Sequence, residues 1–270
     1  MATDFFTQLI EIMARLRGEK GCPWDREQTH QSLRQFLLEE TYEVLETIDQ
    51  NDLPALKEEL GDLLLQIVFH AQIASEEQQF NIHDVVQSIN EKLIRRHPNV
   101  FGEVKIKSAA EQVRNWERLK KTEGRLSVIA GIPKELPALL RAHRLQTKAA
   151  QVGFDWAKID EVWNKVHEEL VELKDATTQN DPEKTAEEFG DLLFSLVNLA
   201  RFLQLNPEDT LRLTIEKFSR RFEQIEQELK RRGKTPEQST LVEMDEIWNR
   251  VKKGDKIKKR TDAKKTVSQK

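Results

Sequence analysis

The sequence repeats itself, and this repetition constrains the possible fold more than any other feature. In the first half, EETYE at 39–43 is followed by EELGD at 58–62. In the second half, EELVE at 168–172 is followed by EEFGD at 187–191. Both acidic motifs are shifted by the same 129 residues, so the spacing between them is also conserved within the chain.

Two further motifs repeat downstream in the same order. The segment EKLIRR at 91–96 matches EKFSRR at 216–221, and WERLK at 116–120 matches WNRVK at 248–252. Their offsets are 125 and 132 residues, close to that of the acidic motifs. Because all the matches occur in the same order and at nearly the same offset, they predict a tandem duplication of a domain of roughly 115 residues.

Apolar residues in both halves are spaced as in amphipathic helices. In the first half they recur at intervals of three and four, as in Leu37, Leu38, Val44, Leu45 and Ile48. Glycine and proline are few, and sustained alternation of period two is absent. One apolar stripe per helix is typical of helices that pack on helices. The sequence therefore predicts an all-α fold, a tandem repeat of two helical-bundle domains.

Composition marks the predicted domain boundaries. Residues 122–135 contain two glycines and a proline and lack helical periodicity, so we expect a linker between domains at 1–121 and 136–253. Residues 254–270 carry an excess of lysine and arginine. We expect them to form a disordered, solvated basic tail, with contact to RNA or a membrane surface as the alternative.

Composition also excludes several classes of protein. The most apolar stretch, near residues 63–74, is about half as long as a membrane span and contains polar side chains. Cys22 is the only cysteine and forms no internal disulfide, which suits a reducing cytoplasm. The net charge of −4 is too close to neutral to indicate nucleic-acid binding. We therefore expect a cytoplasmic protein with neither a membrane nor a nucleic-acid partner.

The acidic motifs predict a metal site in each half. Residues three apart share a helix face, and about fifteen residues separate the two motifs, enough for an antiparallel return. Four converging carboxylates repel one another unless a cation neutralises them. Ligands that offer only oxygen favour Mg²⁺ or Mn²⁺. The predicted ligands are Glu40, Glu43, Glu59 and Asp62 in the first half, and Glu169, Glu172, Glu188 and Asp191 in the second.

Two other interpretations fit part of the acidic pattern. A single pair of glutamates in so charged a chain is usually a solvated face, but the duplicated spacing favours a site. A di-iron carboxylate bundle would need histidine where Asp62 and Asp191 stand, so iron is disfavoured. Gly61 and Gly190 are costly in mid-helix, and a close approach of backbone, metal or partner helix would explain them.

A basic pair follows the acidic motifs in each half. Lys92 and Arg96 are four residues apart, as are Lys217 and Arg221, so each pair can present two cations on one helix face. Alone, such a pair is usually a surface charge cluster. After a carboxylate metal site it suits a triphosphate, because Arg binds oxygens bidentately and Lys adds a point charge.

Aromatic and amide positions suggest where a nucleotide would bind. Trp116 and Trp248 are either core residues or caps over a nucleotide. Seven residues after the last acidic residue, the second half has Asn198 and the first half has Phe69. Asn offers hydrogen bonds to a base, ribose or phosphate-bound water, whereas Phe offers an apolar surface. The alternative is that both are packing residues; otherwise the second half carries most of the activity.

Together these motifs resemble the MazG family of nucleoside triphosphate pyrophosphohydrolases, in its two-domain form. The resemblance covers nearly the whole chain, from about residue 9 to residue 252. Beyond the repeated motifs, it rests on GCPWD at 21–25, RRHP at 95–98, GIP at 131–133, LPAL at 136–139 and GFDW at 153–156.

The resemblance implies an all-α pyrophosphatase fold and a homodimer. It implies Mg²⁺-dependent hydrolysis of NTPs and dNTPs to nucleoside monophosphate and pyrophosphate, as housekeeping of the nucleotide pool. The eight carboxylates above would be the Mg²⁺ ligands. With Asn198, the predicted nucleotide-binding residues are Lys165, Lys217, Arg220, Arg221 and Trp248, and in the first half Lys92, Arg96 and Trp116.

Hydrolysis also needs a proton acceptor for the attacking water. Glu168, with Glu39 as its first-half counterpart, is the candidate catalytic base, unless it merely faces solvent. The competing function is a non-catalytic helical dimeric scaffold or regulator that binds partners through its acidic faces. Such a scaffold would release no pyrophosphate.

Overall fold

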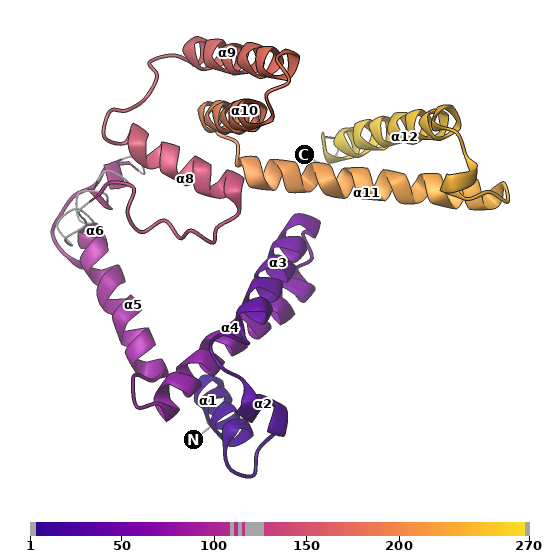
Figure 1. The fold of residues 1–270 in the computed structure, drawn as a ribbon. Helices are drawn as coiled ribbons and strands as arrows, with labels where there is room; N and C mark the ends of the chain where they lie inside the picture. The colour runs from indigo at the N-terminus through magenta and orange to yellow at the C-terminus, as the bar shows by residue number, and fades with distance from the viewer. Residues whose placement is uncertain (1–3, 109–110, 113–114, 117–126, 268–270) are drawn as a thin grey trace. The chain divides into compact units, whose positions relative to one another are not determined.

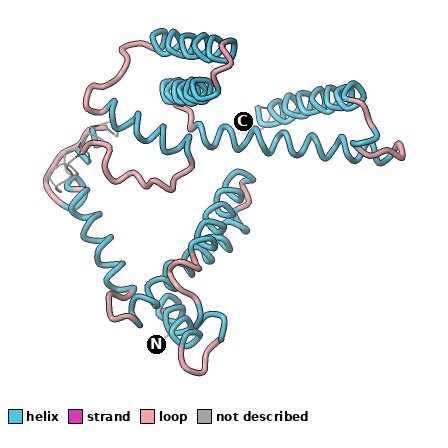
Figure 2. The backbone as a smooth tube through the Cα atoms, viewed as in Figure 1, coloured by secondary structure: helices cyan, strands magenta, loops and turns pink. Residues whose placement is uncertain are grey.

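The computed structural model consists of helices joined by turns and loops (Figure 1). It describes residues 4–108, 111–112, 115–116 and 127–267, and these ranges contain no strand (Figure 2). The all-α prediction is therefore confirmed. The chain divides into two compact units, Met1–Lys120 and Lys121–Lys270. Within the described ranges, no helix combines the length and the apolar character needed to cross a bilayer.

A helix pair and a third helix build the core of the first unit. Helix α3 (Arg34–Gln50) packs along α4 (Leu53–Glu76), and α1 (Phe5–Arg17) packs on α4. The structure also describes α2 (Pro23–Glu27), α5 (Ile82–Arg96) and α6 (Pro98–Phe101) in this unit, and the described residues 111–112 and 115–116 are helical. The buried core residues are Met13, Leu33, Val68, Phe69, Ala71, Ile73 and Ile82.

The second unit repeats the helix pair and adds a long hairpin. Helix α9 (Ile159–Thr178) packs along α10 (Pro182–Phe202), and α8 (Ala138–Ala150) packs on α10. Helix α11 (Pro207–Arg231) returns through a short 3₁₀ turn into α12 (Leu241–Val267). Among its described residues, Val162, Val166 and Leu199 form one small core, and Ile225, Leu229 and Ile247 form another.

The turns inside the two helix pairs have the same conformation. Asn51 after α3 has φ of 55°, and Asn180 in the turn after α9 has φ of 54°, a left-handed conformation that Asn tolerates better than most residues. The next residue, Asp52 or Asp181, caps the following helix by accepting a hydrogen bond from a backbone N–H three residues on. The duplication therefore extends to the turn that brings each acidic helix pair together.

The basic C-terminal segment is helical in the structure as far as Val267. Where we expected a disordered tail over 254–270, α12 continues to Val267, and residues 268–270 lie outside the described residues. The segment contains no proline and is rich in lysine, a good helix former. Arg221 of α11 also pairs with Asp255.

The predicted linker is described in part. Residues 122–126 lie outside the described residues. Residues 127–135 form turns and contain no helix. Gly131 within them has φ of 76°, a conformation that glycine adopts without a steric penalty.

Candidate metal and nucleotide site

The second-half carboxylates converge between α9 and α10. Glu169 lies on α9, Glu188 and Asp191 lie on α10, and one ligand oxygen of each is within 4.8 Å of the others. Glu169 is only 5% exposed, so it is held between the helices. On α9, oxygens of Glu168, Glu169 and Glu172 also lie within 4.8 Å of one another. The structure thus brings the four predicted ligands and the candidate base together.

This cluster attracts cations. Burial raises the pKa of Glu188, and the charge of Glu172 raises it further. Lys165, one turn before Glu169, places its Nζ 2.7 Å from an oxygen of Glu168 and 2.7 Å from an oxygen of Glu169. Its bonds to Glu168 and Glu169 raise the pKa of Lys165. A carboxylate with a raised pKa gains from any nearby positive charge, whether a proton, a lysine or a metal ion.

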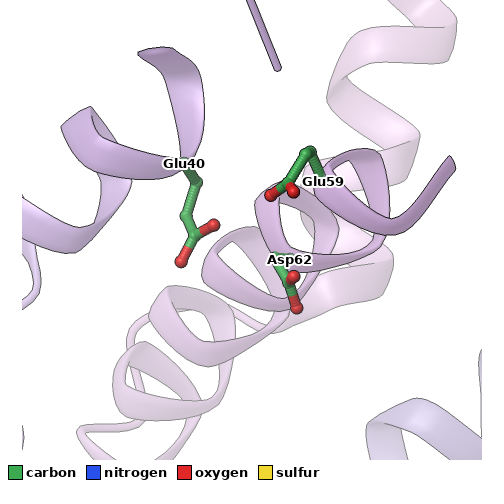
Figure 3. A group of neighbouring side chains, drawn as sticks. All are labelled: Glu40, Glu59 and Asp62. Atoms are coloured by element: carbon green, nitrogen blue, oxygen red, sulfur yellow. The ribbon is translucent and has the colours of Figure 1, made fainter. Parts of the chain in front are cut away.

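The first half repeats the arrangement between α3 and α4. Glu40 extends from α3 toward Glu59 and Asp62 on α4 (Figure 3), and one oxygen of each lies within 4.8 Å of the others. Burial raises the pKa of Glu40, followed by the charge of Asp62. Burial also raises the pKa of Glu59, followed by the charge of Glu43. Glu43 therefore belongs to the same acidic group.

Both acidic groups fit a hard divalent cation. Their donors are all carboxylate oxygens, the ligand type that Mg²⁺ takes. Mg²⁺ holds oxygens at about 2.1 Å, so oxygens on opposite sides of the ion are about 4.2 Å apart. Ligand atoms within 4.8 Å of one another thus need only a small closure to share one ion.

Gly61 and Gly190 each precede the last carboxylate of their group. A Cβ added at either position would meet no atom within 4 Å among the described residues. Among the described residues, no backbone of this chain approaches either glycine closely. Approach of a metal or a partner helix stays a prediction.

A cavity of about 610 Å³ opens beside the second-half carboxylates. Lys165, Glu169 and Asp191 form part of its wall, and the rest comes from α8, the loop at 153–156 and α10. Asn198, predicted to bind nucleotide, also lines it. The volume is within the range of sites for small organic ligands. A ligand in this pocket would contact the acidic group at one end.

The first half lacks two of these pocket residues. Where the second half has Lys165 and Asn198, the first half has Phe36 and Phe69 at the same offset of 129. Phe69 is 3% exposed within the core of the first unit, and Phe36 packs against that core. The first half thus keeps the carboxylates but has aromatic packing at two positions where the second half has polar groups.

The predicted phosphate-contacting residues of α11 lie in a separate cluster. Arg221 donates to Asp255 at 2.8 Å, and its guanidinium lies 5.3 Å from the ring centre of Trp248. Arg220 contacts the same Asp255 at 3.5 Å, and Trp248 packs on the core of the α11–α12 hairpin. Among the described residues, no interaction joins this cluster or Lys217 to the carboxylates of α9 and α10. Within one chain the structure does not bring the two predicted sets together.

The corresponding first-half residues lie at the end of α5. Trp116 Nε1 donates to the backbone carbonyl of Arg96 at 2.9 Å, and the ring of His97 meets the indole edge-on at 5.3 Å. Lys92 is exposed on α5. These contacts fit the first interpretation of Trp116, a packing residue, and its contact with a nucleotide stays a prediction.

Several residues of the pocket were not predicted as site residues, among them Arg201, Asp155 and Gln146. Arg201 on α10 contacts both Asn198 and Asp155, and Gln146 on α8 reaches the backbone of α10. Arg201 had a detectable signal, because it lies three residues after Asn198 on the same helix face. Asp155 lies in the GFDW motif at 153–156, but the motif gave no sign that it meets α10, and Gln146 had no signal, since both approach α10 from distant segments.

Fold and site together define a class, a duplicated all-α protein whose acidic helix pairs suit a divalent metal, with a ligand-sized pocket beside one pair. The sequence model of the MazG nucleotide pyrophosphohydrolase domain matches residues 28–101 and 159–225. The chain therefore belongs to the MazG nucleotide pyrophosphohydrolase family, and the resemblance seen in its motifs is confirmed.

Curated relatives agree over nearly the full length. The chain is 48% identical over 253 residues to the nucleoside triphosphate pyrophosphohydrolase/pyrophosphatase MazG of Thermotoga maritima, covering 93% of this chain and 96% of the relative. It is 44% identical over 253 residues to the nucleoside triphosphate pyrophosphohydrolase of Escherichia coli K12, covering 91% and 96%. A solved mazG-related protein from Thermotoga maritima is 34% identical to this chain. The match covers 43% of this chain and 98% of that protein, with a TM-score of 0.38.

Proposed function

We propose that this chain hydrolyses nucleoside and deoxynucleoside triphosphates to the monophosphate and pyrophosphate, and that its second half carries the activity. The observation that supports this most is that Glu169 and Asp191 belong both to the acidic group and to the wall of the pocket. Full-length relatives carry the name of this activity. Removal of unwanted nucleotides from the cytoplasmic pool is the role we infer, and a single cysteine suits that compartment.

The residues of the acidic group take distinct roles in this proposal. Glu169, Glu172, Glu188 and Asp191 would hold Mg²⁺ or Mn²⁺. Such an ion, when bound, polarises a phosphate and lowers the pKa of a coordinated water. Glu168, whose side chain is 55% exposed at the edge of the group, would accept a proton from water in this proposal.

Lys165 is one source of positive charge for the phosphates at the pocket itself. Lys165 lines the pocket and lies against the carboxylates, so it can turn from Glu168 to a phosphate oxygen when a metal ion neutralises the group. Contacts of Lys217, Arg220, Arg221 and Trp248 with the substrate stay a prediction, as do those of Lys92, Arg96 and Trp116 in the first half.

The bond that is cleaved provides the first test. With ATP and Mg²⁺, we expect AMP and pyrophosphate in equal amounts, because the proposal places attack at the α-phosphate. Anion-exchange separation of the nucleotides, with separate assays for pyrophosphate and orthophosphate, measures this. ADP with orthophosphate would contradict the assigned bond, and no product at all would favour the scaffold alternative.

The proposal includes a homodimer, because the acidic helix pair leaves apolar side chains uncovered. Beside the carboxylates, Leu170 on α9 is 53% exposed and Phe189 on α10 is 54% exposed. Trp163 and Phe194 are more than two-fifths exposed on the same helices. Exposed apolar side chains of this size suit a surface that a partner covers.

Light scattering tests the assembly. At micromolar concentration we expect twice the chain mass of 31.5 kDa, with an interface that buries well over about 1,000 Å². Phe189→Glu should shift the mass toward that of one chain, because it places a charge in the covered face. A wild-type protein that stays monomeric would contradict the proposal.

A further inference from the structure

Arg201 joins two sides of the second-half pocket. Its side chain is 16% exposed, and it lies on α10, three residues after Asn198. Nε and Nη2 donate to Oδ1 of Asn198 at 3.0 and 2.8 Å. Nη1 donates to Oδ2 of Asp155 at 2.9 Å, and Nη2 also contacts Oδ1 of Asp155. All three residues line the pocket.

This network determines which way the amide of Asn198 points. An asparagine amide has an oxygen that accepts hydrogen bonds and a nitrogen that donates them. Arginine only donates, so its two bonds must go to the oxygen. The nitrogen then points away from Arg201. Nδ2 donates in none of the described hydrogen bonds, and it is not among the buried atoms without a partner. It therefore offers two N–H donors at the pocket wall.

A second amide that lines the pocket is held through its nitrogen instead of its oxygen. Gln146 on α8 donates through Nε2 to the carbonyl of Phe194 at 2.8 Å. Phe194 lies one turn before Asn198 on α10, so the two amides approach the same stretch of helix. Oε1 of Gln146 is buried and accepts no hydrogen bond among the described residues. A ligand that donates a hydrogen bond would satisfy it after a small opening of the pocket.

The arrangement suits the nucleoside part of a nucleotide. Asp191 at the acidic end and Asn198 are seven residues apart on α10, which is about 10 Å along the helix. Trp156 and Phe154, 45% and 83% exposed, add aromatic surface to the pocket on which a base can stack. The phosphates would lie at the carboxylates, and the base and sugar would extend toward Asn198.

We propose that Arg201 is a positioning residue for nucleotide binding. Held by Asp155, it fixes the amide of Asn198 so that Nδ2 donates to an acceptor on the base or sugar. This inference rests on the proposed function, because it takes the substrate to be a nucleotide. The network belongs to the second half alone, since the offset of 129 places Gln72 and Phe69 at the positions of Arg201 and Asn198.

Steady-state kinetics of the full chain with ATP and Mg²⁺ test the inference. Arg201→Met and Asn198→Leu should each raise KM about three- to tenfold, the usual effect of one lost hydrogen bond. The value of kcat should change less than about threefold, because the carboxylates are untouched. If Arg201 acts through Asn198, the double variant should be no worse than the more impaired single variant.

Two measurements separate positioning from a general structural role. Inorganic tripolyphosphate carries no nucleoside, so its inhibition constant should be the same in wild type and in both variants. Asn198→Asp keeps an acceptor for Arg201 but lacks the N–H donors, so its KM should rise as in Asn198→Leu. Arg201→Lys, which can reach Asn198 or Asp155 but not both in the same geometry, provides a milder variant if Arg201→Met does not fold.

Arg232→Met is the matched control. Arg232 also pairs with two acidic residues, Glu228 and Glu243, but it follows α11 and does not line the pocket. Its KM should equal that of wild type. Multiplying effects in the double variant, weaker tripolyphosphate inhibition in the Arg201 variants, or an unchanged KM in Asn198→Asp would each overturn the inference. A wild-type protein that forms no AMP and pyrophosphate would instead contradict the proposed function.

Discussion

Glu172→Gln and Asp191→Asn are each expected to lower kcat for NTP hydrolysis by about 100-fold or more. Each change keeps the shape of the side chain and removes a charge from the acidic group that adjoins the pocket. The remaining carboxylates would bind a divalent cation more weakly and in altered geometry. Pyrophosphate release at saturating ATP and Mg²⁺ measures the loss. Circular dichroism and light scattering should show that both variants keep the fold and assembly of wild type.

The duplication supplies matched controls for these variants. Glu43→Gln and Asp62→Asn make the same changes at the equivalent first-half positions, and we expect kcat to fall less than about threefold. Phe36 and Phe69 occupy the places of Lys165 and Asn198 there, so a nucleotide would find an aromatic core at those two positions. Equal losses of kcat from the two sets of variants would show that both halves are catalytic. The difference between Phe69 and Asn198 would then concern packing alone.

Removal of divalent cations is expected to abolish turnover completely and reversibly. EDTA should stop pyrophosphate release, and added Mg²⁺ or Mn²⁺ should restore it, because the acidic groups offer only carboxylate oxygens. Full activity in metal-free buffer would remove the metal site from the proposal. Isothermal titration with Mg²⁺ in the absence of nucleotide provides an independent measurement of binding.

The metal requirement should depend on pH in a defined direction. The pKa of Glu188 is raised by burial and by Glu172, so a proton occupies it at pH values where an isolated glutamate is ionised. Protons and Mg²⁺ then compete for this carboxylate as pH falls toward that raised pKa. We expect the Mg²⁺ concentration for half-maximal activity to rise when pH is lowered. Without metal, the stability that protonation gives is lost as pH rises through the same pKa.

Local patterns were enough to predict the fold class and the acidic groups. Spacing of three between Glu40 and Glu43, and between Glu59 and Asp62, fixes which face each pair occupies. A short turn then brings the two faces together, whatever the rest of the chain does. The same reasoning predicted the second-half group, where Glu169 and Asp191 converge at the pocket.

Features that depend on distant contacts could not be predicted in this way. Asp155 and Arg201 are 46 residues apart and meet only because the loop at 153–156 folds against α10. The spacing of the basic pair on α11 predicts contacts with phosphate. In the structure, Arg221 instead donates to Asp255, a residue that the composition places in a disordered tail. Charge patterns show which side chains are available, whereas tertiary packing decides which partner each one takes.

The burial of Phe69 in the first unit has a consequence for how the chain tolerates mutation. Clustered carboxylates and an open polar pocket are features that activity requires and that reduce the stability of a domain. The second half must keep both, whereas the first half has placed aromatic packing at two of the equivalent positions. If the first half is the more robust, it contributes stability to an assembly that it shares with the second. Substitutions in the second half that raise activity but lower stability would then be tolerated more readily than in a chain with a single such domain.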